Sequence, residues 1–209
     1  MDKKKLLDAI TKTMEGKGKR KFKQSMEIII NMRGIDFSKS ENRLNLDIVL
    51  PKGKGGKELK SAVFAEGGMA DEAKKAGADL VITPDAIPNY AEASKLNDLA
   101  ENYFMLTQPN LMGVVAKSLG QVLGKRGKLP KPITGNIAEL IARSKNSVRI
   151  VSKGKYLPVV QALVGTEQMD TEDLLENAEA VYESVKNKVS EGNIKSVYVK
   201  LTMGTPTKV

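Results

Sequence analysis

The middle of the chain alternates short apolar runs with amphipathic segments, and this alternation limits the fold more than any other feature of the sequence. Apolar runs cover residues 61–65, 79–83 and 103–107, and segments with helical periodicity follow at 69–75, 87–102 and 111–123. A further helix at 136–145 leads into a strand predicted at 147–152. Strands that alternate with helices build a parallel sheet covered on both faces. We therefore predict an inserted Rossmann-like parallel α/β domain over residues 58–150.

This middle segment lacks the sequence marks of a nucleotide site. No Gly-x-Gly-x-x-Gly follows its first strand, so a dinucleotide cofactor is not indicated. The glycine-rich segment 52–57 is followed by Glu58, whereas a Walker loop ends in Gly-Lys-Ser or Gly-Lys-Thr. The segment therefore indicates a basic linker. A nucleotide-dependent enzyme built on residues 58–150 stays as the main alternative function, and no cofactor is predicted.

The flanking segments 1–57 and 151–209 each contain a helix and strands, but neither is a convincing domain by itself. Helices are expected at 3–14 and from 170 to about 189, and strands at 26–33, 44–50, 159–164 and 196–203. Together the flanks predict one discontinuous α/β domain with a mostly antiparallel sheet. Glycines at the two crossings, Gly55, Gly56 and Gly154, predict a double hinge, because glycine adopts backbone conformations closed to other residues.

A dense cationic cluster opens the first strand of this domain. Five of the seven residues from Lys17 to Lys23 are basic, and Phe22 lies among them. Side chains alternate between the faces of a strand, so Phe22 and Met26 are expected on the buried side. In residues 196–203 the same alternation places Met203 on the buried side. The opposite faces carry lysines and hydroxyls, which suit the phosphates and 2′-hydroxyls of RNA.

The charge distribution indicates the same kind of partner. The chain carries a net charge of +9 over 209 residues. Residues 1–57 hold 15 basic and 7 acidic side chains, whereas residues 151–209 hold 7 and 8. A polyanion that docks on the N-terminal part is the simplest inference. Charge alone does not separate RNA from DNA, so a DNA-binding protein stays as a second alternative.

Composition excludes several classes of site. The sequence contains no cysteine and no histidine, which excludes disulfides, thiolate or imidazole metal sites and nucleophilic catalysis that depends on histidine. No apolar run approaches the roughly 20 residues that span a bilayer. The charged N-terminus does not resemble a signal peptide. We therefore expect a cytoplasmic protein without a membrane partner.

Three motifs resemble those of a known family. Residues 21–27, Lys-Phe-Lys-Gln-Ser-Met-Glu, and residues 202–204, Thr-Met-Gly, are similar to motifs of the ribosomal protein L-one family. Residues 123–127, Leu-Gly-Lys-Arg-Gly, resemble the family's Leu-Gly-Pro-Arg-Gly, with Lys125 where proline is usual and Leu129 where methionine is usual. The Gln24-Ser25 pair and residues 62–67 are nearer the archaeal branch. The similarity extends over the whole chain.

The resemblance implies a function and a set of partners. The family is the large-subunit protein of the mobile stalk beside the tRNA exit site. It implies the same discontinuous two-domain split, with movement between open and closed forms. The implied partners are the large-subunit (23S-type) rRNA, the departing E-site tRNA and the protein's own mRNA, whose translation the family represses. The protein would be part of the 50S-type subunit, monomeric when free, and not an enzyme.

The RNA-binding residues are predicted from the two terminal stretches: Lys19, Arg20, Lys21, Phe22, Lys23, Ser25, Glu27, Tyr198, Lys200, Thr202, Met203, Gly204 and Thr205. A secondary RNA contact is predicted at Lys125, Arg126, Lys128 and Lys131, with a plain solvated loop as the alternative. Glu27 either accepts a hydrogen bond from RNA or pairs with Lys200 and orients it. No catalytic residue and no metal ligand is predicted.

Overall fold

The computed structural model describes residues 2–56, 59–151 and 157–209. The chain divides into two compact units: unit 1 contains residues 1–57 and 146–209, and unit 2 contains residues 58–145. The sequence analysis places the second crossing later, at residue 150. The predicted hinge residue Gly154 lies outside the described residues. None of the helices in these ranges is both long and apolar enough to cross a membrane.

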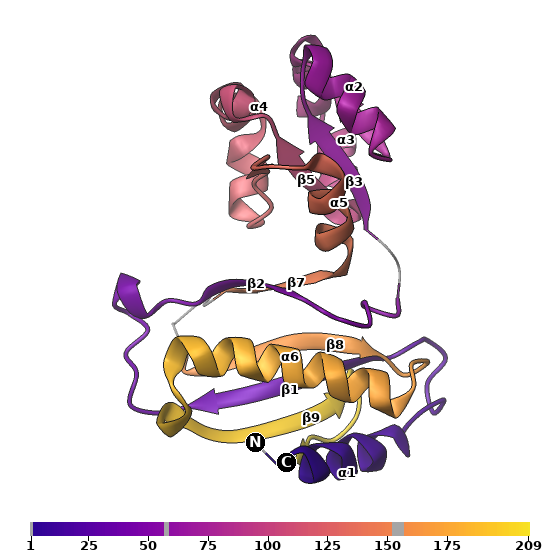
Figure 1. The fold of residues 1–209 in the computed structure, drawn as a ribbon, viewed down its shortest axis with the longest axis vertical. Coiled ribbons are helices and arrows are strands. Elements are labelled where there is room, and N and C mark those ends of the chain that lie inside the picture. The colour runs from indigo at the N-terminus through magenta and orange to yellow at the C-terminus, as the bar shows by residue number, and fades with distance from the viewer. Residues whose placement is uncertain (1, 57–58, 152–156) are drawn as a thin grey trace. The chain divides into compact units, whose positions relative to one another are not determined.

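Unit 1 is built on a four-stranded antiparallel sheet of order β10-β9-β1-β8. Its elements are α1 (Lys3–Met14), β1 (Ser25–Met32), η1 (Ser40–Asn42), β2 (Asn45–Val49), β7 (Ser147–Val151), β8 (Val159–Thr166), α6 (Thr171–Val189), η4 (Glu191–Asn193), β9 (Ile194–Leu201) and β10 (Thr207–Lys208). Figure 1 shows β1, from the N-terminal flank, between β8 and β9 from the C-terminal flank. Both flanks therefore contribute to one sheet.

One face of this sheet is covered and the other is open. On β1 the burial alternates residue by residue, with Met26, Ile28 and Ile30 fully buried and the residues between them half-buried. Helix α1 packs against β9 and helix α6 against β8, and the two helices contact each other. The predicted apolar stripe of α6, from Leu174 to Val189, lies in this core, which confirms its orientation. We call the half-buried side of β8, β1 and β9 the open face.

The loop that precedes β1 follows from local sequence signals. Asp2 caps α1, because its Oδ1 accepts a hydrogen bond from Lys4 N at 3.0 Å. The helix ends at Met14, and Gly18 follows with a φ of 73°. In this left-handed region glycine carries no steric strain. The chain can therefore turn from the helix into the cationic cluster.

Strands β2 and β7 form a separate antiparallel ribbon within unit 1. Leu46 pairs with Ile150 and Ile48 with Val148. The sequence pattern assigns residues 147–152 to the parallel domain because the run follows a helix, and this assignment is wrong. Ile48 and Ile150 are buried in the core of unit 1, and this burial favours pairing with β2.

Unit 2 is a Rossmann-like α/β unit with a parallel sheet of order β4-β3-β5-β6. Its elements are β3 (Lys60–Phe64), α2 (Gly67–Lys75), β4 (Leu80–Ile82), η2 (Pro84–Ala91), α3 (Ala93–Asn102), β5 (Tyr103–Thr107), η3 (Pro109–Leu111), α4 (Met112–Lys125), β6 (Lys131–Pro132) and α5 (Ile137–Asn146). Ala62 and Phe64 pack with α3 and α4, while Val63 and Ala65 pack with α2 and α5. Helices thus cover both faces, and the predicted fold class is confirmed.

The largest differences between the predicted and observed helices of unit 2 lie at two places. The stretch 87–102 is divided into the 3₁₀ helix η2 and the α-helix α3. Pro84 and Pro88 lack the N–H that an α-helix needs, so this helix begins only after them. Helix α4 runs to Lys125 instead of ending at 123. The glycine at 124 is therefore tolerated near the helix end.

Candidate nucleic-acid interface

The two terminal stretches meet at one end of the unit 1 sheet. Thr202 N donates to Ser25 O at 3.0 Å, and Ser25 N donates to Thr202 Oγ1 at 3.1 Å. β1 begins at Ser25 and β9 ends at Leu201, and antiparallel pairing places the start of one strand beside the end of the other. The sheet therefore brings the two terminal stretches side by side. We call residues 19–27 and 198–205 the terminal surface.

The cationic part of the terminal surface is exposed. Lys19, Arg20, Lys21 and Lys23 are all exposed, and among the described residues none of their side chains forms an ion pair or a hydrogen bond. Their charges are therefore open to a partner. Phe22 is 50% exposed, which corrects the expectation that it lies on the buried side of a strand. The physical reason is that β1 begins only at Ser25, after a bend.

Lys200 and Glu27 face each other across β1 and β9. The two residues pair in the strand register, and Lys200 Nζ lies 3.9 Å from Glu27 Oε2. Lys200 Nζ also donates to Thr202 O at 2.9 Å. Both side chains are partly shielded, at 21% and 31% exposure. The carboxylate and the carbonyl thus hold the ammonium group at the edge of the terminal surface.

The Thr-Met-Gly motif lies in a turn after β9. Gly204 N donates to Leu201 O at 2.9 Å, which closes the turn. Met203 is 57% exposed, so its predicted place on the buried side of a strand is wrong, because the strand ends at Leu201. A Cβ at Gly204 would lie 3.3 Å from the Cβ of Leu201. Close packing within the turn therefore favours glycine at this position.

The open face continues the terminal surface along the sheet. Asn31 Nδ2 donates to Ser196 Oγ at 3.0 Å. Two residues along β1 toward the terminal surface, Ile29 lies between Gln161 on β8 and Tyr198 on β9. The predicted site omitted Asn31 and Ser196, although strand alternation places them on the same side as Glu27 and Tyr198. The acidic helix α6 covers the opposite face, so its carboxylates do not line this surface.

The second predicted cluster lies in unit 2 and is partly engaged within the protein. Arg126 donates to Asn97 Oδ1 at 2.7 Å and lies 3.5 Å from Glu101 Oε1, which ties the end of α4 to α3. Lys125 is the last residue of α4 and Lys131 belongs to β6. The expected loop is therefore shorter than residues 123–132, because helix and strand enter it from both sides.

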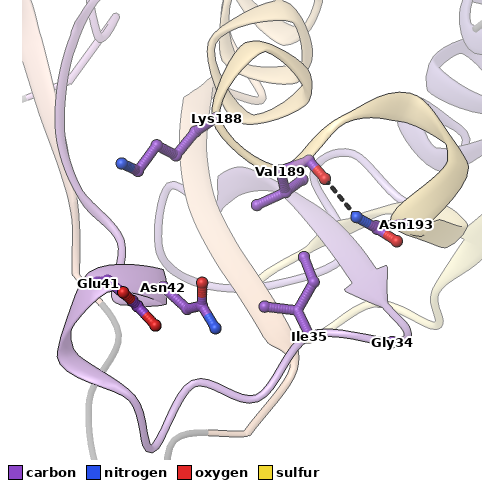
Figure 2. A pocket seen from close by; sticks show the side chains of 7 residues that line it. All are labelled: Gly34, Ile35, Glu41, Asn42, Lys188, Val189 and Asn193. Carbon is purple, nitrogen blue, oxygen red and sulfur yellow. Dashed lines mark hydrogen bonds between the residues drawn. The ribbon is translucent and has the colours of Figure 1, made fainter.

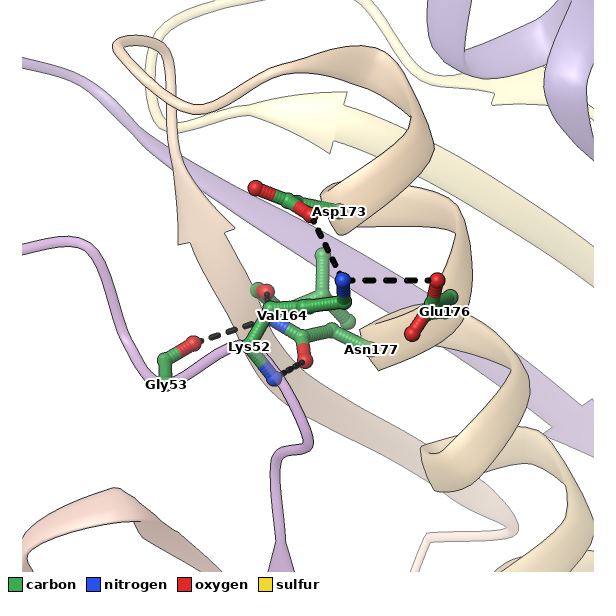
Figure 3. A network of polar contacts seen from close by, with 6 residues as sticks. All are labelled: Lys52, Gly53, Val164, Asp173, Glu176 and Asn177. Carbon is green, nitrogen blue, oxygen red and sulfur yellow. Dashed lines mark hydrogen bonds and ion pairs between the residues drawn. The ribbon is translucent and has the colours of Figure 1, made fainter.

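The first crossing segment is fastened to unit 1 through Asn177 (Figure 3). This side chain is fully buried on α6. Its Oδ1 accepts a hydrogen bond from Lys52 N at 3.0 Å, and its Nδ2 donates to Gly53 O and Val164 O, both at 2.8 Å. One amide thus joins the crossing, the long helix and strand β8.

Two further contacts hold the same segment. Lys52 Nζ lies 3.3 Å from Asp173 Oδ1 and 3.6 Å from Glu176 Oε1, and its hydrogen bond to Asp173 and the charge of Glu176 raise the pKa of Lys52 (Figure 3). Thr166 Oγ1 donates to Gly55 O at 2.8 Å. Gly55 has a φ of 65°, where glycine is strongly favoured. The chain is therefore held to unit 1 as far as Gly55.

A polar pocket lies at the other end of the β1–β9 pair (Figure 2). It has a volume of about 440 Å³ and is lined by Gly34, Ile35, Glu41, Asn42, Lys188, Val189 and Asn193. Asn193 Nδ2 donates to Val189 O at 2.7 Å and so satisfies the end of α6. None of the predicted site residues lines this pocket. Among the described residues, no three acidic side chains gather to hold a metal ion.

Comparison with known sequences gives the family. The model of the Ribosomal protein L1p/L10e family matches residues 10–205. The chain is 41% identical to "Large ribosomal subunit protein uL1" of Methanothermobacter thermautotrophicus, over 98% of both chains. Proteins of the same name from Thermofilum pendens and Methanocella arvoryzae are 44% and 39% identical. The alignment with the Thermofilum protein covers 91% of this chain and 86% of the relative, and the alignment with the Methanocella protein covers both chains completely.

The names of these relatives describe a structural component and not a catalyst, in agreement with the prediction that the chain is not an enzyme. The archaeal sources agree with the branch indicated by the sequence motifs. The family model spans nearly the whole chain, and each relative aligns over most of its own length. The chain therefore belongs to the Ribosomal protein L1p/L10e family.

Proposed function

We propose that this protein is a component of the large ribosomal subunit that binds a folded region of the large-subunit rRNA through its terminal surface. One observation carries the proposal. The exposed cationic loop, residues 17–23, and the Thr-Met-Gly turn, residues 202–204, meet at one end of the open face. Family membership supports it, because the relatives are named as large ribosomal subunit proteins. The protein acts in the cytoplasm and is monomeric before assembly.

The exposed cations provide the electrostatic part of binding. Lys19, Arg20, Lys21 and Lys23 each neutralise a phosphate and release counterions, which makes affinity fall steeply as salt rises. Phe22 stands exposed among them and stacks on a base or ribose. Lys200 adds a cation at the edge of the sheet, held in place by Glu27 and Thr202 O.

The hydroxyl groups divide between two roles. Among the described residues Ser25 Oγ makes no hydrogen bond, so it can reach a sugar or phosphate oxygen. Thr202 Oγ1 accepts from Ser25 N and lies 3.2 Å from Ser25 O, so it fixes the turn against the strand. Ser25 therefore contacts RNA while Thr202 shapes the surface on which RNA lies.

The finer parts of the proposal rest on the resemblance of the motifs. We propose that the protein forms the mobile stalk, contacts the departing E-site tRNA, and represses translation of its own mRNA by binding a structure that imitates the rRNA site. One surface can serve rRNA and mRNA because both present the same phosphates and 2′-hydroxyls. Because Thr166 holds Gly55 to unit 1, we propose that Gly56, and not Gly55, is the hinge residue of the first crossing.

The test of rRNA binding uses Ser25→Ala. Loss of one hydrogen bond to RNA should weaken affinity for in vitro transcribed large-subunit rRNA about fivefold, from roughly 1 kcal/mol per bond. The measurement is filter binding at several salt concentrations, with duplex RNA and duplex DNA as competitors.

Ser118→Ala is the matched control, because Ser118 is exposed on α4 of unit 2. It should leave the affinity unchanged. Equal affinity for rRNA and duplex DNA in the unsubstituted protein would contradict the proposed function. An unchanged affinity of Ser25→Ala would remove only the role of this hydroxyl.

A further inference from the structure

We infer that Glu167 and Gln24 are positioning residues that fix the cationic loop relative to the Thr-Met-Gly turn, an inference that rests on the function proposed above. Neither residue needs to touch RNA. Both are buried, with Gln24 only 2% and Glu167 only 6% exposed. Their side chains form a connection beneath the terminal surface, and this connection sets the spacing of the groups that a folded RNA would contact.

The connection is a chain of hydrogen bonds. Glu167 Oε2 accepts from Gly18 N at 3.3 Å, at the start of the cationic loop, and from Gln24 Nε2 at 3.2 Å. Gln24 Oε1 accepts from Met203 N at 3.2 Å, within the Thr-Met-Gly turn. Glu167 N also donates to Gln24 O at 2.9 Å. Three segments distant in sequence are thus joined by two side chains.

The backbone of β8 aims Glu167 into this place. Met26 pairs with Gly165 and Glu27 with Leu163, so Val164 is an extra residue on β8. A bulge of this kind bends a strand and redirects the side chains that follow it. A Cβ at Gly165 would lie 2.5 Å from Leu174 Cδ2 on α6, so any other residue here would force this side chain to move. Glu167 follows two residues after this constrained position.

The negative charge of Glu167 opposes the binding of an anion at the terminal surface, so its presence there requires another reason. Among the described residues Glu167 forms no ion pair, although five basic residues lie between Lys17 and Lys23. It is satisfied by one backbone N–H and one amide instead. An ion pair between Glu167 and a lysine of the loop would have made that lysine less available to the phosphates of RNA. The arrangement therefore orders the loop and leaves its cations available.

The arrangement makes the sign of a charge removal diagnostic. If Glu167 acted only through its field, Glu167→Leu would tighten binding of every nucleic acid, because a negative charge is removed near phosphates. If it positions the loop, the same change weakens binding of the folded rRNA, because it also removes the oxygen that accepts from Gly18 N and Gln24 Nε2. Glu172→Gln removes the same charge from an exposed site at the start of α6 and is the matched control.

The experiment measures the ratio of affinities for in vitro transcribed large-subunit rRNA and for random-sequence duplex RNA, well below the melting temperature of each variant. We expect Glu167→Leu and Gln24→Glu to lower this ratio roughly fivefold or more, and Glu172→Gln to leave it unchanged. Circular dichroism establishes that each variant is folded, so a lower ratio reports on the shape of the surface and not on unfolding.

A pair exchange provides the rescue. In Gln24→Glu combined with Glu167→Gln, a donor again faces an acceptor between the two side chains and Met203 N keeps its acceptor. Gly18 N loses its acceptor, because it shares one oxygen of Glu167 with Gln24 Nε2. We expect the affinity ratio to return toward that of the unsubstituted protein. Single variants that retain the full ratio would overturn the positioning role. An unsubstituted protein without preference for rRNA would overturn the proposed function and this inference together.

Discussion

The sheets of the two units differ in what they leave exposed. The antiparallel sheet of unit 1 is covered by α1 and α6 on one face only, so alternate side chains of β1 and β9 stay half-buried. The parallel sheet of unit 2 has a core on each face, formed with α3 and α4 on one side and α2 and α5 on the other. Strand side chains can therefore form a binding surface in unit 1, whereas unit 2 offers a ligand only its loops and helices.

The charge follows the same division. Residues 1–57 contain 15 basic and 7 acidic side chains, whereas residues 58–150 contain 12 and 10. In unit 1 Lys19, Arg20, Lys21 and Lys23 make no ion pairs among the described residues, while in unit 2 Arg126 is engaged with Asn97 and Glu101. A basic cluster is therefore a candidate site when it adjoins an uncovered sheet face and its charges form no ion pairs within the protein.

The largest expected effect comes from removing the cations of the terminal surface. Lys19, Arg20, Lys21 and Lys23, all changed to glutamine, should lose on the order of a thousandfold in affinity for large-subunit rRNA at low salt, because four phosphate contacts disappear. The slope of log affinity against log salt should fall in magnitude by about 3, from roughly 0.7 to 0.9 per contact. Filter binding over a salt series measures both quantities.

The control for this change removes the same charge from unit 2. Lys125, Arg126, Lys128 and Lys131 changed to glutamine should alter affinity and salt slope little. A loss comparable to that of the terminal surface would break the comparison and establish the second cluster as an RNA contact. Equal losses for rRNA and duplex DNA in both variants would instead mean that the cations bind without selectivity.

A smaller effect is expected on the stability of unit 1 alone. Asn177→Leu keeps the volume of the side chain but leaves Lys52 N, Gly53 O and Val164 O without their partner. Buried polar groups without partners are costly, so unit 1 should lose about 2 to 3 kcal/mol of unfolding free energy. Amide hydrogen exchange should show weaker protection in β1 and β9 and unchanged protection in β3 and β5.

Asn187→Leu is the matched variant, since Asn187 is exposed on the same helix. It should change the stability by less than about 0.5 kcal/mol. If Asn177→Leu lowered protection in β3 and β5 as well, the two units would unfold together and would not be independent in stability.

Sequence reasoning found most of the elements because their periodicity is strong. The helix at 3–14 and the strand at 103–107 have the predicted bounds, and the stripe from Leu174 to Val189 is buried as predicted. The errors lie where tertiary contacts determine which strands pair. Residues 147–151 follow a helix in sequence, yet their pairing depends on Ile48 and Ile150, which no local pattern relates.

The residues of the candidate site could be predicted from the sequence, but the strand limits and buried contacts that position them could not. The cations and the Thr-Met-Gly turn are visible in the sequence, whereas strand limits decide that Phe22 and Met203 are exposed. Glu167 gave no signal, because a single glutamate after a strand is ordinary. Its role depends on hydrogen bonds to Gly18 and Gln24, which are far from it in sequence.

The smallest expected effect concerns the pH dependence of unit 2. Asp79 Oδ2 accepts from Ser61 N and Ser61 Oγ, both at 2.8 Å, and these bonds hold the pKa of Asp79 below its usual value of 3.8. The folded state thus binds fewer protons than the unfolded state, so its stabilisation is complete above the usual pKa and is lost as pH falls through the lowered one. Because Asp79 is over a third exposed, we expect less than about 1 kcal/mol. Asp79→Asn should flatten the acid limb of unit 2, which is the fall of its unfolding free energy as pH decreases. Urea unfolding followed by hydrogen exchange of the β3 amides measures this free energy. Asp71→Asn, an exposed carboxylate on α2, should keep the acid limb. Since unit 1 contains neither residue, an equal flattening of the acid limb in β1 would mean that the two compact units unfold as one.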